Sequence, residues 1–407
     1  MSVAAALRKS CASRSFSRST TPSFIGPLGL SAPVRSLDIR IVGGGLAGMI
    51  TGLQLQQTKP KDAEYRITVY ETNPEPYTTL CGEGISHLNL SRFTAFESAK
   101  HTAQSFQGAH WWLPDETLLE VKQRCYTIER ATWIPAMAEQ FQKNGGTLKL
   151  GHKVTPDELR KFASEADIVI GADGPGSVTR KTLIPDAKVD VKLGIQYRVK
   201  GATFNSDWLE FYTDKRYCSE YAWVFPKGDT LNVGLLADDP AGDWKRLDAF
   251  MRDKKVDGKV AVKEAYPIGF SGTKVQGGPR NNVLLVGDSG GMTNPVTKGG
   301  ICATILGSEI LADCVAKDEV ARYNDRLMKH PIMDRSFSKA IQFIVRCSND
   351  DINNLSKHLP DVVRVGDGEP KGKYFPAVVK AGLFNLDKML DLLNIYKALA
   401  LSKDYSW

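Results

Sequence analysis

A glycine-rich pattern near residue 45 constrains the fold of this chain more than any other feature. Apolar residues predict a buried strand before Gly43-x-Gly45-x-x-Gly48 and a helix after it, and a second predicted strand, RITVYE, ends in Glu71. In such a unit the first glycine permits a tight turn and the second lets the backbone approach a pyrophosphate. The third glycine lets helix and strand pack closely. The pattern therefore predicts a nucleotide-binding βαβ unit.

The residue that ends the second strand supports this interpretation. Glu71 stands where a carboxylate accepts hydrogen bonds from ribose hydroxyls, and the helix N-terminus offers free N–H groups to phosphates. Because all parts occur together, the sequence predicts a dinucleotide site, whereas the glycines alone would be consistent with an incidental turn. An acid at this position disfavours the 2′-phosphate of NADP and does not separate NAD from FAD.

Two later strands each run into a short turn. The stretch ADIVIGADGPG contains Asp173-Gly174, and the stretch NNVLLVGDSGG contains Gly287-Asp288. Taken alone, each has an ordinary explanation, because Asp-Gly is a common turn dipeptide and an aspartate after a strand can cap a helix. Their order after the first motif is what makes them informative.

In that order the three motifs resemble glutathione-reductase-type flavoproteins of the p-hydroxybenzoate hydroxylase class, which implies one bound FAD. The resemblance implies that Asp288 holds the ribityl and phosphate region. It also implies that the helix after Lys298-Gly299-Gly300 points its N-terminus at the flavin pyrimidine, where it stabilises negative charge. Arg130 matches an arginine of this class at a helix start, and the alternative is a solvated side chain. The implied cofactor-binding residues are Gly43, Gly45, Gly48, Glu71, Arg130, Asp173, Gly174, Gly287, Asp288, Lys298, Gly299 and Gly300.

The sequence contains no second GxGxxG pattern. We therefore expect one tightly bound dinucleotide and an external electron donor, which could be NADPH, ferredoxin or another reductase.

Two further stretches narrow the class. CGEGIS, residues 81–86, resembles a loop of geranylgeranyl reductases in which a cysteine is followed by glycine, an acid and serine near the isoalloxazine ring. YAWVFPKGDTLNVGLL resembles the Tyr-x-Trp-x-Phe-Pro signature of the same family, with Gly234 following. Strand alternation places Tyr221, Trp223 and Phe225 on one face, as an apolar wall suited to a polyprenyl chain. The alternative is an ordinary aromatic core strand.

The sequence departs from this family at two positions. Leu235-Leu236 follows Gly234 where the signature closes with a second glycine, and Lys298 stands where a glycine is usual. A lysine near flavin N1 would favour the reduced anion if its side chain turned inward, and it could equally point to solvent.

The resemblance implies reduction of C=C bonds in a geranylgeranyl-type chain by hydride transfer from reduced flavin. Cys81 and Glu83 are the candidate catalytic residues. The thiol would shape the site or relay a proton, and the carboxylate would relay a proton or cap the loop. The alternatives are an aromatic-ring monooxygenase and a non-catalytic flavin-binding subunit of an organellar complex.

The predicted fold class is α/β, with a Rossmann-type FAD-binding domain formed by residues 38–180 and 280–330. Short alternating strands predict an inserted antiparallel-sheet domain at residues 181–279 for the substrate. Residues 331–407 are predicted to be a helical region. Its last 60 or so residues are amphipathic and would cover the substrate cavity, lie on a membrane surface or pack on the body.

Residues 1–37 have the composition of an organellar targeting segment. They contain five basic residues, no acidic residue and many serines, and we expect mitochondrial rather than plastid import. The alternative is a disordered tail without a targeting role. Without residues 1–37 the net charge of +7 falls to about +2, so a nucleic-acid partner is not expected. The seven cysteines are scattered and form no CxxC or Cys/His cluster, so no metal site is expected.

Overall fold

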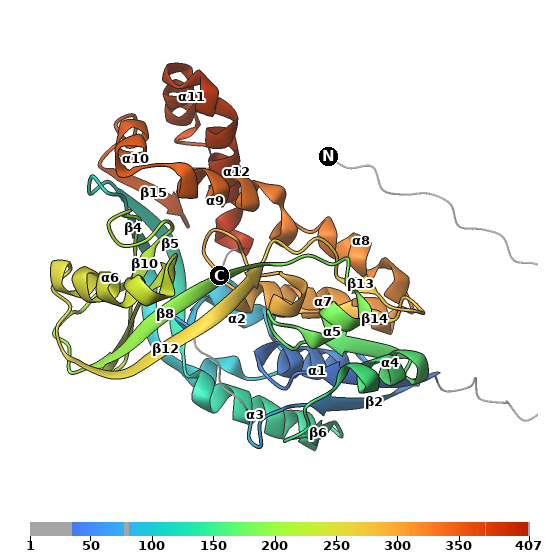
Figure 1. Ribbon diagram of the computed structural model, residues 1–407. Coiled ribbons are helices and arrows are strands. Elements are labelled where there is room, and N and C mark those ends of the chain that lie inside the picture. The colour runs from blue at the N-terminus through green and yellow to red at the C-terminus, as the bar shows by residue number, and fades with distance from the viewer. Residues whose placement is uncertain (1–34, 77–80, 371, 406–407) are drawn as a thin grey trace, which may run out of the picture. The chain divides into compact units, whose positions relative to one another are not determined.

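The computed structural model describes residues 35–76, 81–370 and 372–405 (Figure 1). The predicted targeting segment thus lies outside the described residues, apart from its last three. These three belong to strand β1 (Arg35–Val42). Arg35 pairs with Ala63 of the neighbouring strand, and its guanidinium lies 2.5 Å from the Asp318 carboxylate. The first strand therefore begins three residues before the predicted boundary.

The smaller of two sheets follows the glycine-rich pattern. Its strand order is β13-β14-β7-β1-β2-β6, and all neighbours are parallel except β13 and β14. Strands of parallel sheets are buried on both faces and read as apolar runs, which is why IRIV and IVIG form its centre. Its strands are β1 (Arg35–Val42), β2 (Ala63–Tyr70), β6 (Thr147–Lys149), β7 (Ile168–Gly171), β13 (Gln276–Gly277) and β14 (Val283–Leu285).

Five helices accompany this sheet in two groups. Helix α1 packs against both α3 and α7, whereas α4 and α5 pack against each other and against β7. Figure 1 shows α1 beside α7, and α4 beside α5. The five helices are α1 (Leu46–Thr58), α3 (Arg130–Lys143), α4 (Pro156–Glu165), α5 (Val178–Leu183) and α7 (Ile301–Ala316). This arrangement is that of a Rossmann-type domain.

The larger sheet has nine strands. Its order is β12-β8-β11-β10-β9-β4-β5-β15, and β3 pairs separately with β5. The pairs β4–β9 and β5–β15 are parallel, and the others are antiparallel. Its strands are β3 (Gly84–Ser86), β4 (Thr102–Trp112), β5 (Leu118–Ile128), β8 (Asp190–Lys200), β9 (Trp208–Tyr212), β10 (Ala222–Lys227), β11 (Thr230–Ala237), β12 (Lys259–Phe270) and β15 (Val362–Gly366).

The two sheets cross the predicted domain boundaries. Strands β4 and β5 lie within residues 38–180, which the sequence predicts to belong to the FAD-binding domain, yet they join the larger sheet. Strand β15 joins it from residues 331–407, and β13 joins the smaller sheet from residues 181–279. The larger sheet is consequently mixed. The β4–β9 and β5–β15 pairings link positions 100 or more residues apart, as in Gly108 with Trp208, so no local pattern indicates them, whereas β13 pairs with the nearby β14.

The remaining helices lie mostly in the C-terminal part of the chain. Helix α12 packs against α9 and α11, and α6 packs against β11. No helix within the described ranges is long and apolar enough to cross a membrane. The remaining α-helices are α2 (His87–Arg92), α6 (Pro240–Asp253), α8 (Tyr323–Met328), α9 (Arg335–Arg346), α10 (Asn349–Ser356), α11 (Phe375–Phe384) and α12 (Met389–Tyr405). The 3₁₀ turns are η1 (Ser98–His101), η2 (Gly287–Gly290), η3 (Val320–Arg322), η4 (Pro331–Met333) and η5 (Leu386–Lys388).

One close contact explains the glycine that follows the aromatic strand. Gly234 of β11 lies opposite Trp223 of β10. A Cβ added at Gly234 would lie 2.2 Å from the indole of Trp223 and 2.4 Å from the carbonyl oxygen of Ile195. The indole therefore lies across the backbone of β11, and only glycine leaves room for it.

We expect Gly234→Ala to lower the free energy of unfolding by about 1–3 kcal/mol, because the added methyl group overpacks a buried position. Urea unfolding followed by tryptophan fluorescence measures the change. Gly176→Ala is the matched control, since a Cβ there would meet no described atom within 4 Å beyond its chain neighbours. Equal stability of the two variants would contradict the role given to Gly234.

Candidate active site

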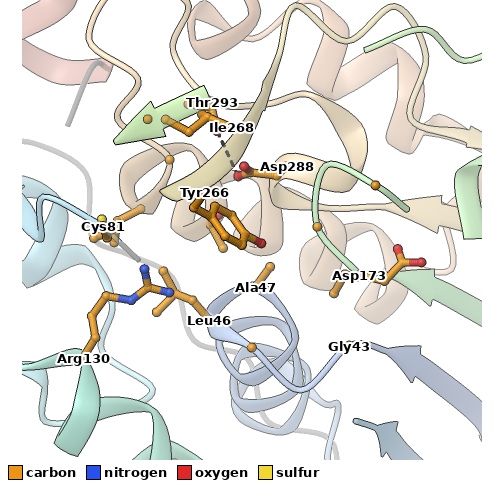
Figure 2. Close-up of a pocket in the computed structure, with 18 of the residues that line it drawn as sticks. Gly43, Leu46, Ala47, Cys81, Arg130, Asp173, Tyr266, Ile268, Asp288 and Thr293 are labelled. Carbon is orange, nitrogen blue, oxygen red and sulfur yellow. Dashed lines mark hydrogen bonds between the residues drawn. The ribbon is translucent and has the colours of Figure 1, made fainter. Parts of the chain in front are cut away.

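A cavity of about 660 Å³ lies between the two sheets (Figure 2). The ends of β1, β2 and β7 line one part of it, and strands β10, β11 and β12 line the other. Ligands of open α/β sheets bind outside the carboxyl ends of the strands, which is where this cavity lies. The predicted site residues that line it are Gly43, Gly45, Glu71, Cys81, Glu83, Arg130, Asp173, Gly174, Tyr221, Trp223, Phe225, Asp288, Lys298, Gly299 and Gly300.

The glycine-rich turn forms a cradle at the N-terminus of α1. Gly43 has φ of +102°, and its N–H donates to the carbonyl of Tyr70 at 2.8 Å. A Cβ at Gly48 would lie 1.9 Å from the Gly43 carbonyl oxygen, so Gly48 lets the helix approach the turn and does not line the cavity. A Cβ at Gly45 would meet no described atom within 4 Å beyond its chain neighbours. The space beside Gly45 therefore fits a pyrophosphate.

Glu71 lies at the rim of this cradle and is buried. Its carboxylate accepts the N–H of Gly44 at 2.7 Å and the backbone and side-chain N–H groups of Asn73 at 2.8 and 2.6 Å. These bonds hold the carboxylate at the end of β2, beside the open space at Gly45. The position suits a hydrogen bond with a ribose hydroxyl.

The carboxylate of Asp173 organises its own turn. It accepts hydrogen bonds from the Ser177 hydroxyl at 2.6 Å and from the N–H and hydroxyl of Thr179 at 2.9 and 3.0 Å. Burial raises the pKa of Asp173, and these bonds oppose that shift. Gly174 follows with φ of +75°. Asp173 thus lines the cavity while its carboxylate caps the start of α5.

Asp288 is held in the wall of the cavity by two hydrogen bonds. Its carboxylate accepts the Gly269 N–H and the Thr293 hydroxyl, both at 3.0 Å. Burial raises the pKa of Asp288, whereas the charge of Arg130 opposes that shift. Figure 2 shows Asp288 bound to Thr293, with Tyr266 beside it. Gly287 precedes it with φ of +66°, near Ala47, and does not line the cavity.

Arg130 is the first residue of α3 and is 6% exposed. Figure 2 shows its side chain reaching from α3 into the cavity, near Leu46. The solvated arginine that the sequence left as an alternative is therefore not what the structure has. The guanidinium adds positive charge beside the cradle, where phosphate groups would lie.

Lys298 points neither freely into the cavity nor to solvent. Its ammonium lies 2.6 Å from the Glu220 carboxylate, contacts the carbonyl of Pro295, and lies 4.1 Å from the centre of the Phe270 ring. Gly299 and Gly300 then lead into α7, with Gly300 at the N-cap. The free N–H groups of this helix N-terminus therefore lie at the cavity, while the lysine charge is paired.

The aromatic strand forms the apolar wall of the cavity. Tyr221, Trp223 and Phe225 are buried and all line it, as strand alternation predicts. The Tyr221 hydroxyl donates to the Thr297 carbonyl at 2.5 Å, and the Trp223 indole N–H donates to the Gln196 side chain at 3.2 Å. Each polar ring atom is thus satisfied outside the wall, and the ring faces remain for an apolar ligand.

The CGEGIS loop lies on this wall. A Cβ at Gly82 would lie 2.8 Å from the Phe225 ring and 3.7 Å from the Trp223 indole nitrogen, so rings of the protein itself explain this glycine. The Cys81 sulfur accepts the Glu83 N–H at 3.2 Å and lies at the cavity. The loop therefore brings the thiol beside the aromatic wall.

Glu83 anchors this loop. It has φ of +67°, and its carboxylate lies 2.5 Å from the Lys227 ammonium and 3.2 Å from the Asn232 amide nitrogen. Its side chain is 2% exposed and that of Lys227 is 4% exposed. Of the two roles that the sequence left open for Glu83, this geometry favours holding the loop over moving a proton.

Sequence reasoning missed several residues of the cavity. Gln196 joins the Cys81 carbonyl, the Trp223 indole and the Glu264 carboxylate through one side chain. Alternation along β8 and β12 could have indicated inward positions, but which strand neighbours the loop has no local signal. The other missed residues include Phe211, Leu236, Tyr266, Ile268, Thr293 and Thr304.

Comparison with known proteins gives the following relatives. No protein-family model matches the chain. Digeranylgeranylglycerophospholipid reductase 2 of Methanopyrus kandleri is 26% identical over 391 residues, covering 84% of this chain and 96% of the relative. Digeranylgeranylglycerophospholipid reductase of Methanosarcina mazei is 24% identical over 367 residues, covering 80% and 89%.

Solved structures match over a similar extent. A geranylgeranyl bacteriochlorophyll reductase-like protein of Thermoplasma acidophilum has a TM-score of 0.69 and 19% identity, covering 88% of this chain and 99% of its own. The flavin-dependent halogenase CmlS has a TM-score of 0.57 and 16% identity, covering 87% and 78%. At these identities the likeness establishes the fold, and it confirms the predicted fold class.

We expect Gly45→Ala to weaken FAD binding about tenfold or more, because the methyl group enters the space that fits the pyrophosphate. The free energy of unfolding of the apoprotein should change by less than about 1 kcal/mol, since the added atom meets open space. Gly48→Ala is the contrasting variant, and it should destabilise the apoprotein itself. Fluorescence titration with FAD and urea unfolding measure the two effects. Unchanged FAD affinity of Gly45→Ala would place the cofactor elsewhere.

Proposed function

We propose that this chain, which belongs to the geranylgeranyl reductase family of FAD-dependent flavoproteins, reduces carbon–carbon double bonds of a polyprenyl lipid. The observation that carries the proposal is that one cavity joins a dinucleotide cradle to an aromatic wall. The relatives from Methanopyrus and Methanosarcina are named as reductases of a lipid that carries two geranylgeranyl chains.

The apolar part of the cavity suits a prenyl chain. Phe211, Phe225, Leu236 and Ile268 line it together with Trp223. Apolar surface removed from water gains roughly 25 cal/mol per Å², so a branched hydrocarbon chain is retained there without a specific polar contact. A small polar aromatic substrate would leave this wall largely uncovered.

The residues of the other part fit FAD as the cofactor. The open space at Gly45 and the guanidinium of Arg130 suit its phosphates, and the carboxylates of Glu71 and Asp288 suit sugar and ribityl hydroxyls. The N-terminus of α7 would stabilise negative charge on the flavin pyrimidine. When bound and reduced, FAD supplies a hydride.

The protein has to orient the double bond and provide a proton. Reduction adds a hydride to one alkene carbon and a proton to the other, and an isolated alkene reacts only when it is held close and in line. The aromatic wall supplies that placement and excludes water. Burial raises the pKa of Tyr221 well above its usual value, and its hydroxyl is bound to Thr297, so it is a poor acid. Cys81, beside the wall, remains the candidate for the proton relay.

The electron donor is a separate protein or nucleotide. The sequence has one GxGxxG pattern, which the FAD cradle uses, so a diffusing donor such as NADPH, ferredoxin or another reductase must deliver two electrons for each bond reduced. Turnover with each donor in an otherwise identical assay identifies it.

We expect the FAD-loaded protein, reduced by dithionite under anaerobic conditions, to convert a geranylgeranyl lipid into products heavier by two hydrogens per bond. Mass spectrometry measures this gain. Absence of any gain with geranylgeranyl diphosphate, phospholipid and quinone substrates would contradict the proposal. Substrate-stimulated oxygen consumption with a hydroxylated product would instead support the monooxygenase, and an inert flavin the non-catalytic subunit.

The same assay tests the thiol. Cys81→Ser should slow the reduction or change the distribution of partly reduced products, because the serine hydroxyl is a weaker acid than the thiol. Cys314→Ser, a buried cysteine on α7 that does not line the cavity, is the matched control. An unchanged rate and product distribution in Cys81→Ser would remove Cys81 from the mechanism.

We also infer a peripheral lipid contact through the turn between α11 and α12. Leu383 and Leu390 flank this turn and are 62% and 76% exposed, and Phe375 at the start of α11 is 44% exposed. Lys380 is exposed on the same helix and complements anionic head groups. Helix pairs of this kind bury such side chains at the interface of a bilayer, where a prenyl lipid resides.

We expect Leu383→Gln combined with Leu390→Gln to reduce binding to vesicles of phosphatidylcholine and phosphatidylglycerol about tenfold, since two apolar anchors are lost. Co-sedimentation measures the bound fraction. Val191→Gln, at an exposed valine of the larger sheet, is the control and should bind like the unaltered protein. Equal binding of all three proteins would exclude this turn as the contact.

A further inference from the structure

Lys298 occupies a backbone conformation that a glycine would adopt without strain. Its φ is +52°, in the left-handed region, and its side chain is 2% exposed. A long cationic side chain is costly at such a position unless its charge is paired. The side-chain contacts therefore have to explain why a lysine is tolerated here.

The charge is paired within a row of alternating signs that runs from the buried Lys298 and Glu220 to the exposed Asp238. The Lys298 ammonium lies 2.6 Å from the Glu220 carboxylate, which lies 3.5 Å from the Lys192 ammonium, which in turn lies 2.6 Å from Asp238. Burial lowers the pKa of Lys298, and the charge of Glu220 opposes that shift. The positive charge of Lys298 is thus balanced by a carboxylate of the larger sheet.

A second bond reinforces the same junction. The hydroxyl of Tyr221, next to Glu220, donates to the carbonyl of Thr297, next to Lys298, at 2.5 Å. Two successive residues before β10 therefore hold two successive residues before α7. Thr297 and Lys298 line the cavity, as does Tyr221, so the junction lies between its two parts.

The loop also has an internal support that does not reach the sheet. The Asn294 side-chain oxygen accepts the N–H groups of Val296 and Thr297 at 2.9 and 3.1 Å. These bonds shape residues 294–300 from within, and Val296 packs against Phe337 and Ala340 of α9, but none of these contacts ties the loop to the aromatic strand. The contacts that join the loop to the aromatic strand are those made by Glu220 and Tyr221.

We propose that Lys298 is a positioning residue that holds the loop before α7 against the aromatic strand through its buried ion pair with Glu220. The pair sets the distance between the helix N-terminus that would face the flavin and the wall that would hold the prenyl chain. The inference rests on the proposed function only where it predicts the rate of prenyl reduction. The alternative is that Lys298 acts directly on the flavin through its charge.

Two variants separate these roles. Lys298→Met removes the cation and Glu220→Gln removes its partner. If Lys298 acts by charge, the two variants shift the flavin midpoint potential in opposite directions, because one removes a positive charge and the other leaves it uncompensated. If Lys298 positions the loop, both variants increase amide hydrogen exchange in residues 294–301 and weaken FAD binding, each about tenfold. The double variant then loses less FAD affinity than the product of the two single losses.

Lys298→Gly removes the side chain without straining the backbone, because glycine adopts φ of +52° readily, so a loss of folding is not expected. This variant should fold, yet it should show the same faster exchange. Lys274→Met breaks an exposed ion pair with Asp186 and is the matched control, with exchange in residues 294–301 and FAD affinity as in the unaltered protein. Unaltered exchange and FAD affinity in Lys298→Gly would overturn the proposal, as would opposite shifts in potential.

Hydrogen exchange and FAD affinity require no prenyl substrate. The positioning role of Lys298 can therefore be established even if no prenyl lipid is reduced. That outcome would contradict the proposed function alone. With a substrate, single-turnover oxidation of the reduced flavin should slow in Lys298→Gly, while reduction of its flavin by dithionite keeps the rate of the unaltered protein. A slower dithionite reaction and an unaltered prenyl reaction would contradict the positioning role.

Discussion

The buried ammonium of Lys227 joins three segments on which the active site depends. Lys227 is the last residue of strand β10, and its ammonium lies 2.5 Å from the Glu83 carboxylate and 3.1 Å from the Glu129 carboxylate. Glu83 belongs to the loop that carries Cys81, and Glu129 immediately precedes Arg130 at the start of α3. Losing one partner of a buried ion pair leaves an uncompensated charge, at a cost of about 3–5 kcal/mol. One cation thus holds the aromatic wall, the thiol loop and the arginine of the cradle in register.

The two stretches that resemble geranylgeranyl reductases contact each other in the fold. Residues 81–86 lie on residues 221–226, because Gly82 leaves room for the ring of Phe225, and Gln196 binds both the carbonyl of Cys81 and the indole of Trp223. Each stretch therefore restricts the other. A larger residue at position 82 would displace the ring, and a different ring would no longer support the loop.

How much of the site could be predicted depends on how far apart in the sequence the interacting residues lie. The turn at Gly43 and the approach at Gly48 involve neighbouring strands and a helix joined by short connections, so residue spacing reports them. The ion pair of Glu83 with Lys227 joins positions 144 residues apart, and nothing near Glu83 in the sequence distinguishes an anchor from a proton relay. The same limit applies to β4 and β5, because their own residues do not indicate which sheet they join.

Strand β10 is held at both ends by buried ion pairs. Lys227 at its end binds the loop with Glu83, and Glu220 before its start binds Lys298 ahead of α7. Between these two attachments lie the rings that form the apolar wall. A wall fixed at both ends cannot move relative to one loop without straining the other, so the thiol, the rings and the helix N-terminus keep one geometry. Such preorganisation is what a reaction of an unactivated alkene demands, because the protein cannot rely on substrate polarity to bring the reacting atoms together.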